Sequence, residues 1–565
     1  TVIPHDMRRG DAVLAARADW DTWAWSRSVL AGEVAPTEDD VLAYSAAPFT
    51  REEYRRALGR LQLGKATQPG DDISAELLTH AGEMTSVALR SFFTAVKTDP
   101  FRRTPTAWRR VTEVGIYKGK RDRLVYTSHR PLQLVVIVSK LYEYCLRYRG
   151  DVMSSVEAWQ AVGQHGVDVR HVVYVTQEAV LHELAHGRGA VQLGDDTHKA
   201  FQCTTTEGSA LGLYVEGLRA HVLAGVAALG TTVQVKIRVA PGQYAPTVTL
   251  FRRTGQGTVW SPRKYPADHR GATTAFRAAG LGLCIGGVNL GYHKFMDDQQ
   301  LLLPWTGPDL REARDAVVAV HEWGRTRGYF NDDLRVAVYG VAAAEVPARL
   351  HFRHTPQPDP DGRPAPDLVV DVEVQNRLRI IGYEYGGGHL ATALDLLWQN
   401  VRRIEADANR VGSYLLAGQQ RWSWTLHARA QLEFALAVQL ETPAEARNAE
   451  DAQLAALKAW TRTASRTGAR YDYDALLEYY GEETLAARRL IARIAFSVSL
   501  ELLRWRSWAD EPHRAHRVAD TQARPAEQAR YVEYLRSFAR QGEADARADL
   551  PTPAAHFSRI GATSR

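Results

Sequence analysis

Cysteine is scarce in this chain. Cys145, Cys203 and Cys284 are the only three among 565 residues, and they lie far apart. Such spacing supports neither a disulfide framework nor a zinc knuckle built from cysteine pairs. We therefore expect an intracellular, reducing compartment, with the nucleus or an organelle such as the mitochondrion as candidates. A first residue of Thr rather than Met fits a processed or partial chain, for example one that has lost an organellar presequence.

Long apolar runs are missing as well. Runs such as 134–138 and 222–229 are much shorter than the roughly 20 residues that a membrane-spanning helix needs. No secretory apolar segment follows the N-terminus. We therefore expect no membrane span. With 45% hydrophobic residues the chain can bury a sizeable core, and its length predicts several subdomains.

The charge balance is only mildly basic, with a net charge of +5, so the distribution of charge is more informative than its sum. Residues 101–130 contain nine Lys or Arg against two acids, interleaved with Trp108, Tyr117 and Tyr126. Cations mixed with aromatic rings are typical of surfaces that bind nucleic acid. The alternative is a solvated basic face without a partner.

Two adjacent acids, Asp297 and Asp298, lie between Phe295-Met296 and the apolar run 301–303. Apolar residues on both sides predict two strands joined by a tight turn that carries the acids. Adjacent carboxylates repel each other, and a divalent cation such as Mg²⁺ relieves that repulsion. A lone Asp-Asp pair, however, more often marks an exposed turn.

A third acid, Asp196, follows the apolar segment 190–193, which we interpret as the end of a strand. Two-metal phosphoryl transfer requires carboxylates from separate elements that meet around ions about 4 Å apart. The sequence therefore predicts that Asp196 and Asp297 converge.

These acids belong to an ordered series of segments that resembles the reverse transcriptase of non-LTR retrotransposons. Residues 196–201 resemble the motif DxxKAF, 256–262 resemble QGxxxSP, and 295–298 resemble YxDD. The other similar segments, in chain order, are 63–71, 116–120, 130–141, 164–167, 323–331 and 385–387.

The resemblance implies an α+β fold of the right-hand polymerase type, with fingers, a palm built on an antiparallel sheet, a thumb and a mostly helical C-terminal region. The expected parts are a helical extension (1–48), fingers and palm (49–349), a Pro-rich loop with a primer-grip-like hairpin (350–390), a helical thumb (391–440) and a helical C-terminal region (441–565).

The resemblance also implies an activity, RNA-directed extension of a primer 3′-hydroxyl with deoxynucleotide triphosphates, and nucleic acid as the partner. The implied site consists of Asp196, Asp297 and Asp298 as ligands of two Mg²⁺ ions, Lys118 and Arg130 on the triphosphate, Phe201 under the incoming sugar, and Gln256 with Gly257 against the nascent base pair.

The chain departs from the family pattern in several places. Asp195 fills a position that is usually apolar, so either Asp195 or Asp196 points inward to the metal. Residues 263–268 are charged where the family has an apolar helix, and Pro266 is expected to break that helix or delay its start. The family's Lys after Asn331 is missing, and no endonuclease is visible. These departures favour an alternative, a domesticated and inactive descendant that serves as a structural RNA-binding subunit of a ribonucleoprotein such as an organellar (mitochondrial) ribosome.

A third function is suggested by His182-Glu183-Leu184-Ala185-His186, which fits the zinc-peptidase helix motif. With 19 histidines in the chain such a match arises readily by chance, and the third-ligand position of metzincins is taken by Gln192. Glu207 or Glu216 could supply a third ligand of the gluzincin kind, but neither lies in a convincing helical context. We interpret the segment as an ordinary helix with Val180 and Leu184 on its apolar face.

Local patterns predict further elements. They are a helix over 12–30, a capping box at Thr50 and Glu53, an irregular loop over the prolines of 356–366, a hairpin over 368–384, and an apolar helical stripe from Ile491 to Trp505.

Overall fold

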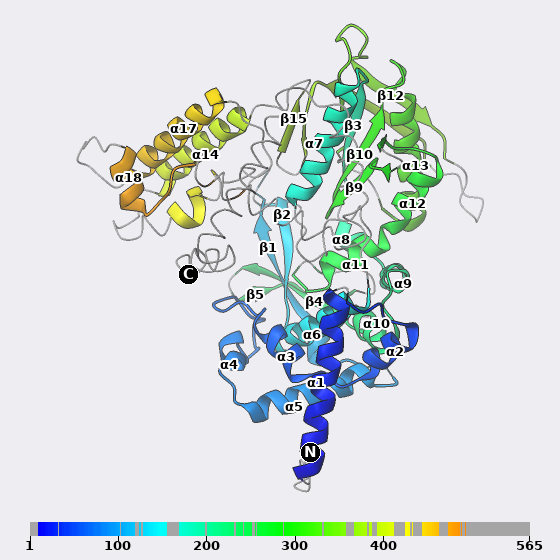
Figure 1. Cartoon of the computed structure of the whole chain (residues 1–565), viewed down its shortest axis with the longest axis vertical. Coiled ribbons are helices and arrows are strands. Elements are labelled where there is room, and N and C mark those ends of the chain that lie inside the picture. Colours follow the sequence, from blue (N-terminus) through cyan, green and yellow to red (C-terminus); the bar gives the residue numbers. More distant parts are fainter. Residues whose placement is uncertain are drawn as a thin grey trace. The chain divides into compact units, whose positions relative to one another are not determined.

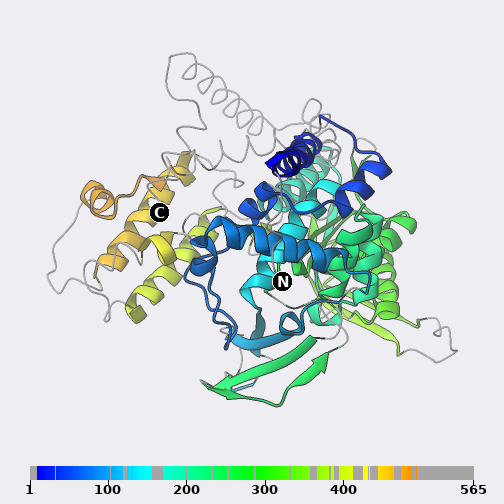
Figure 2. The ribbon, with the colours of Figure 1, turned by 90° about the horizontal axis from the view of Figure 1, so that it is seen from below.

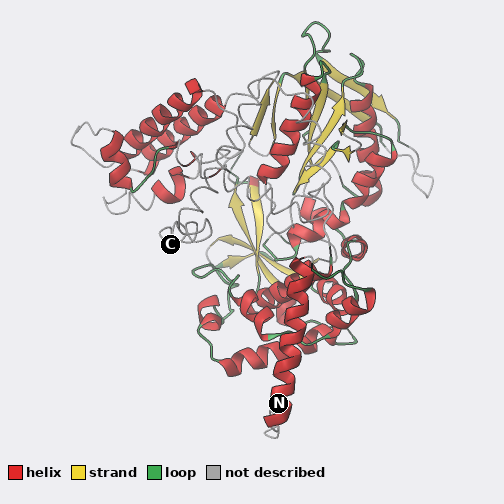
Figure 3. Ribbon diagram, viewed as in Figure 1, coloured by secondary structure: helices red, strands yellow, loops and turns green. Residues whose placement is uncertain are grey.

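In the computed structural model the chain forms two compact units made of interleaved segments (Figure 1). Unit 1 comprises Thr1–Gln164, Asp196–Ala279 and Ala319–Asp332, and unit 2 comprises His165–Asp195, Gly280–Val318 and Asp333–Arg565. The structure describes residues 9–492 with gaps, of which the longest are 155–168, 357–365, 387–392, 412–423, 433–442 and 463–472. Each unit combines helices with a mixed sheet (Figure 3), which confirms the expected α+β class.

Unit 1 is largely helical around a central helix, α6 (Ile137–Met153), whose Leu141, Tyr142 and Leu146 are completely buried. The predicted N-terminal helix is confirmed as α1 (Arg9–Ala31). The other helices are α2 (Glu38–Ala46), α3 (Arg51–Leu58), α4 (Ala75–Thr79), α5 (Glu83–Thr98), α8 (Ala200–Cys203), α9 (Thr206–Val215), α10 (Ala220–Ala228), α11 (Ser261–Asp268) and α12 (Arg270–Ala278).

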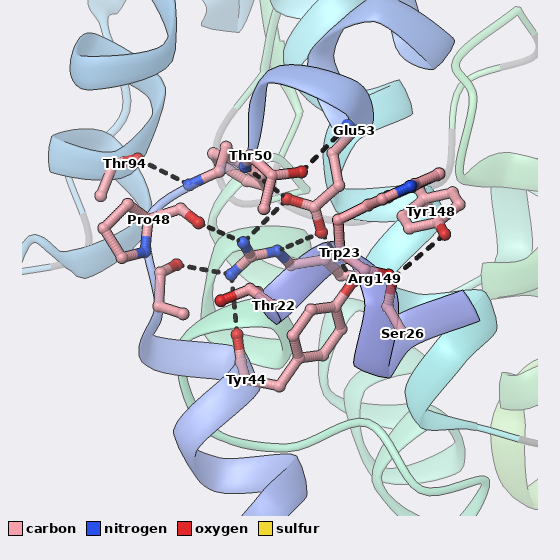
Figure 4. A network of polar contacts seen from close by, with 12 residues as sticks. Thr22, Trp23, Ser26, Tyr44, Pro48, Thr50, Glu53, Thr94, Tyr148 and Arg149 are labelled. Atoms are coloured by element: carbon pink, nitrogen blue, oxygen red, sulfur yellow. Dashed lines mark hydrogen bonds and ion pairs between the residues drawn. The ribbon is translucent and has the colours of Figure 1, made fainter. Parts of the chain in front are cut away.

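The predicted capping box at the start of α3 is confirmed, since the Thr50 side chain accepts from the Glu53 N–H and the Glu53 carboxylate accepts from the Thr50 N–H. Glu53 has a second role, because it forms a completely buried ion pair with Arg149 of α6 (Nη2 to Oε2, 2.9 Å). Arg149 also donates to the backbone carbonyls of Tyr44, Ala47 and Pro48 (Figure 4). Every charge in this network therefore has several hydrogen-bond partners.

The sheet of unit 1 has the order β2-β1-β4-β5, and β6 also pairs with β4. Its strands are β1 (Arg110–Tyr117), β2 (His129–Leu134), β4 (Val233–Ala240), β5 (Gln243–Tyr244) and β6 (Val248–Leu250). β1 and β4 run parallel, and the other pairs are antiparallel. Val111, Val135 and Val235 form a small apolar cluster on one face.

The sheet of unit 2 has the order β12-β13-β11-β3-β10-β9. Its strands are β3 (Ala190–Asp196), β9 (Tyr292–Phe295), β10 (Asp298–Pro304), β11 (Arg335–Tyr339), β12 (Arg349–His354) and β13 (Leu368–Gln375). The predicted strand before Asp196 is thus confirmed, and it is a central strand. Helix α7 (Val169–Ala185) packs on the sheet through Val173, Val180 and neighbouring apolar residues.

Further elements belong wholly or partly to unit 2. They are α13 (Arg311–Arg327), the two-stranded pairs β7 (Cys284–Ile285) with β8 (Val288–Asn289) and β14 (Arg377–Ile380) with β15 (Tyr383–Gly386), and a helical cluster of α14 (Ala393–Val411), a π-helical turn (Trp424–Ala428), α17 (Pro443–Arg462) and α18 (Tyr473–Tyr480). In the cluster Ile404, Ala452 and Leu457 are completely buried. Helices α14 and α17 of this cluster lie side by side (Figure 2).

The predicted hairpin over 368–384 is wrong. β13 pairs instead with β12 and β11, while β14 forms its own hairpin with β15. The alternation of apolar and polar residues identified the strands correctly, but strand partners are chosen by long-range packing that the local pattern does not contain. The Pro-rich loop lies mostly outside the described residues, and the stripe from Ile491 to Trp505 lies almost entirely outside them.

Candidate active site

The acids Asp297 and Asp298 lie at the tip of the β9–β10 hairpin, as predicted. Phe295 pairs with Asp298, so Met296 and Asp297 form a two-residue loop. Met296 has a φ of 57°, a left-handed conformation that costs a residue with a side chain roughly 1–2 kcal/mol. Two-residue hairpin loops need positive φ, and glycine usually supplies it. A methionine held there is a strained backbone position of the kind found at functional sites.

The end of β3 lies at the same edge of the sheet as this hairpin tip. β3 and β10 are neighbouring strands, and the Trp305 N–H just after β10 donates to the Gly189 carbonyl just before β3 (3.0 Å). This contact joins the end of one strand to the start of the other, so the two strands are antiparallel. In a regular ladder Asp196, the last residue of β3, is then level with Asp298, the first residue of β10.

The register also separates the two candidate acids on β3. Asp195 and Asp196 are consecutive in a strand and so face opposite sides of the sheet. Asp195 is buried, with 4% of its surface exposed, whereas Asp196, Asp297 and Asp298 are partly exposed. Asp196 is thus the residue on the accessible side, level with the hairpin acids.

A chain of buried polar side chains supports the strands beneath these acids. The Thr176 hydroxyl of α7 donates to Gln300 Oε1 (2.9 Å), Gln192 Nε2 donates to the same oxygen (3.3 Å), and the Tyr339 hydroxyl donates to Gln192 Oε1 (2.7 Å). The network connects α7, β3, β10 and β11. Hydrogen-bonded networks in a low-dielectric interior hold their members rigidly. The network therefore restrains the strands β3 and β10, whose ends carry the acids.

The donor set fits Mg²⁺ only in part. Across the described ranges, no group of three or more His, Cys, Asp or Glu side chains is arranged to hold a metal by itself. Mg²⁺, however, is usually held by one or two carboxylates together with waters and substrate phosphates. Asp196, Asp297 and Asp298 supply carboxylates of that kind from two adjacent strand ends.

Lys118 and Arg130, the residues implied for the triphosphate, both lie in unit 1. Arg130 of β2 is opposite Ile116 of β1, and Lys118 follows two residues later on the same face. The register therefore makes the two cations diagonal neighbours on one face of the sheet. Both side chains are exposed.

Phe201, implied to lie under the incoming sugar, is a buried residue of unit 1 with 8% of its surface exposed. Its ring packs against Tyr265, with centroids 5.5 Å apart. Tyr265 in turn contacts His269 and Tyr329. The ring is thus one member of an aromatic cluster that joins α8, α11 and the segment just after α13.

The loop before α11 contains the implied nucleotide-binding residues, of which Gln256 lies outside the described residues. Gly257 has a φ of 112°, and a Cβ there would lie 2.6 Å from the Gln133 carbonyl oxygen. Glycine is therefore required for close packing of the loop on β2.

Glu143 of α6, which the sequence did not indicate as a site residue, also forms hydrogen bonds with this loop. Its Oε2 accepts from the Val259 N–H (2.8 Å), and its backbone carbonyl accepts from Trp260 Nε1 (3.2 Å). Burial raises the pKa of Glu143 to about 6, against the lowering effects of these hydrogen bonds and of the nearby Lys264. Burial likewise lowers the pKa of Lys264 to about 8.

Helix α11 begins at Ser261, so the expectation that Pro266 delays its start is wrong, and Pro262 in the first turn favours that start. The helix ends at Asp268, shortly after Pro266, and α12 begins at Arg270, which agrees with the expected break. An internal proline removes one backbone hydrogen bond and stops the helix from continuing far.

The charged residues of α11 are buried, and each has partners in unit 1. Arg263 contacts Asp151 (3.2 Å) and Glu216 (3.3 Å). Asp268 accepts from the Tyr329 hydroxyl (2.6 Å) and the Thr205 N–H (2.9 Å). The charged side chains of α11 are therefore matched by acids and hydroxyls elsewhere in unit 1.

The zinc-peptidase motif lies at the C-terminal end of α7, as the interpretation of an ordinary helix requires. Glu183 is buried and forms a bidentate pair with Arg188, at 2.7 Å from each oxygen. The His186 ring lies against the His182 carbonyl (Nδ1 to O, 2.8 Å). The carboxylate that would polarise a water is thus engaged by a guanidinium. Val180 and Leu184 pack on the apolar core of the sheet, as predicted.

Comparison of the sequence with protein-family models and with curated proteins gives no match. Within the described parts of the chain, helices are either too short or too polar to cross a lipid bilayer.

Proposed function

We propose that this protein is a Mg²⁺-dependent nucleotidyltransferase of the reverse-transcriptase type, which extends a nucleic-acid primer along an RNA template. The observation that carries the proposal is the edge of the six-stranded sheet, where Asp196 at the end of β3 is level with Asp298 and the tight turn of Met296 and Asp297. The right-hand arrangement of fingers, palm and thumb is part of the same proposal.

In this proposal each residue has a distinct role. Asp196, Asp297 and Asp298 hold the divalent ions and orient the primer hydroxyl toward the α-phosphate. Bound Mg²⁺ would lower the pKa of the attacking hydroxyl and neutralise charge on the leaving pyrophosphate. Lys118 and Arg130, diagonal neighbours on one sheet face, bind the triphosphate. The polar network below β3 and β10 keeps the acids at a fixed spacing, which positional catalysis requires.

A second candidate, the inactive ribonucleoprotein subunit, is favoured by the surroundings of Phe201 and α11. The Phe201 ring is packed against Tyr265, and α11 uses its charged side chains for internal ion pairs. A residue that selects a sugar needs a face toward the substrate. If these features persist when a substrate is offered, the fold would serve RNA binding without chemistry.

Primer extension separates the two candidates. Purified full-length protein is given poly(rA) primed with oligo(dT), dTTP and Mg²⁺, and product length is followed on a gel. We expect extension by the wild type and a loss of at least about 100-fold for Asp297→Ala, since removing a group that stabilises transition-state charge costs factors of this order. Asp309→Ala, which removes an exposed acid from a turn outside the site, is the matched control and should retain full activity.

Two outcomes would contradict the proposal. If Asp297→Ala extends the primer at the wild-type rate, the acids do not catalyse the reaction. If the wild type binds primed template but extends it under no condition tested, the second candidate is favoured. EDTA should stop extension, and added Mg²⁺ should restore it.

A further inference from the structure

The five strands of the unit 1 sheet have a marked separation of charge between their two faces. Register fixes which residues share a face, because directly paired residues point the same way. Thr112 pairs with Lys236, Val114 with Arg238, and Ile116 with Arg130. Arg110 belongs to the same face, two residues before Thr112. This basic face therefore carries Arg110, Arg130, Lys236 and Arg238, all exposed.

The strands carry a single acid, Glu113. It belongs to the opposite face, where Val111, Val135 and Val235 form the apolar cluster, and it is buried, with 2% of its surface exposed. Cations from three adjacent strands thus share one surface without a carboxylate from the same sheet between them. Adjacent like charges repel each other, and an anionic partner relieves that repulsion.

One aromatic ring completes the surface. Tyr244 of β5 pairs with Arg238 of β4, and Lys236 Nζ lies 5.6 Å from its ring centroid. A partly exposed ring beside cations offers a stacking surface for a base next to charges for the phosphates. The two cations of β4 are separated by about 7 Å along the strand. No segment that resembles the polymerase family includes β4, β5 or β6.

In unit 2, exposed arginines of one strand have acidic partners within the chain. Arg349 of the edge strand β12 contacts Asp371 (2.6 Å), and Arg353 of the same strand contacts Asp367. Both acids come from β13 or the residue just before it. The arginines of β12 thus have acidic partners on the neighbouring strand, whereas no strand of the unit 1 sheet places an acid on the face of Lys236 and Arg238. This contrast points to different roles for the two surfaces.

We propose that this basic face, at Arg110, Lys236, Arg238 and Tyr244, binds the phosphodiester backbone of a single-stranded nucleic acid, while Arg130 keeps its role at the triphosphate. The binding uses charge and one stacking contact, so it is largely independent of sequence. It also does not depend on catalysis, and both candidate functions are compatible with it.

The test measures binding alone. Full-length protein is titrated into a fluorescein-labelled single-stranded RNA of about 20 nucleotides, which is longer than a typical single-fold site, in EDTA and without nucleotides, at several salt concentrations. Lys236→Ala/Arg238→Ala should weaken binding by at least about ten-fold at low salt and reduce the slope of log K against log salt by about 2, one for each lost phosphate contact.

Arg349→Ala/Arg353→Ala is the matched control, because it removes the same number of positive charges from exposed positions of a strand. It should bind RNA within about two-fold of the wild type. Lys236→Arg/Arg238→Lys keeps both charges and should retain binding, which distinguishes lost contacts from a damaged fold. Asp297→Ala should bind normally, so a failure of the proposed catalysis would leave this result unaffected.

Equal RNA affinity for Lys236→Ala/Arg238→Ala and the wild type would overturn the inference. Equal losses in the double variant and in the β12 control would also overturn it, since they would show an effect of net charge only. Vesicles of phosphatidylserine and phosphatidylcholine provide the last comparison. Loss of vesicle binding in the double variant, with RNA binding unchanged, would assign the face to a lipid surface instead.

Discussion

Arg149 in unit 1 and Asp297 in unit 2 are both charged, but their surroundings are opposite. Arg149 is completely buried and donates to Glu53 and to three backbone carbonyls. Asp297 is partly exposed, lies beside a second acid, and follows a methionine with a positive φ. The first arrangement satisfies its charge internally, whereas the second leaves charge and strain at a surface. Compensated charge stabilises a fold, and uncompensated charge is available for a ligand.

The largest expected effect tests the compensated side of this comparison. Arg149→Met should lower the free energy of unfolding by about 3–5 kcal/mol, because it leaves the Glu53 carboxylate buried without its cation. Burial alone would raise the pKa of Glu53, but the charge and hydrogen bonds of Arg149 hold it below its usual value. Urea unfolding followed by circular dichroism measures the change.

Arg147→Met on the same helix is the control for that variant. The Arg147 side chain is 17% exposed, and its salt-bridge partner Asp151 is 31% exposed, so water screens the pair, and we expect a loss nearer about 1 kcal/mol. Equal losses in the two variants would mean that the buried network contributes no more than an ordinary partly exposed pair.

A smaller effect concerns Glu143, whose charge is buried but shared with the loop before α11. Its folded pKa of about 6 lies above the usual 4.5, so the folded state binds the proton more tightly. The group's stabilising contribution is therefore full at low pH and is lost as pH rises from 4.5 through 6. One pKa unit corresponds to about 1.4 kcal/mol, which gives a loss of about 2 kcal/mol at most.

Glu143→Gln cannot titrate and still offers an oxygen to the Val259 N–H. Relative to the wild type, this variant should thus gain up to about 2 kcal/mol of stability between pH 4 and pH 7. Glu76→Gln is the control of opposite sign, because the Gly64 N–H lowers the pKa of Glu76 and its contribution is lost as pH falls. Stability curves for Glu143→Gln and the wild type that stay parallel across this range would refute the assignment.

The smallest expected effect tests the uncompensated side. In the absence of divalent ions, Asp297→Asn should change the free energy of unfolding by less than about 0.5 kcal/mol, as is usual for surface sites. The change should favour the variant slightly, since it removes repulsion from Asp298. Thermal unfolding in EDTA measures it. A strong destabilisation would show that Asp297 supports the hairpin and would weaken the contrast with Arg149.

The elements that sequence reasoning predicted well depend on neighbours in the chain. The capping box of α3 involves residues three apart, and the β9–β10 hairpin follows from apolar runs on both sides of a short turn. The partners of Glu53, Arg263 and Glu143 escaped prediction because they are remote. Arg149 is 96 residues from Glu53, and Val259 is 116 residues from Glu143.

The prediction of strand pairing failed for the same reason. β13 was identified as a strand from its alternating pattern, but its partners β12 and β11 are selected by burial across the whole sheet. At the candidate site, the sequence predicted which acids lie at strand ends but could not choose between Asp195 and Asp196. That choice depends on which face of β3 is covered, and only the packed sheet determines it.

The interleaving of the two units has a consequence for biosynthesis. The polypeptide crosses from one unit to the other five times, the last time between Asp332 and Asp333. The ribosome must therefore synthesise Asp332 before unit 1 has all its segments, and by then two of the three segments of unit 2 have also been synthesised. Unit 1 therefore has all its segments while unit 2 still lacks residues 333–565, but the segments of unit 1 are separated during synthesis by segments of unit 2. Cutting the gene at a single position between His165 and Asp332 would accordingly divide the segments of both units and leave both halves with incomplete cores.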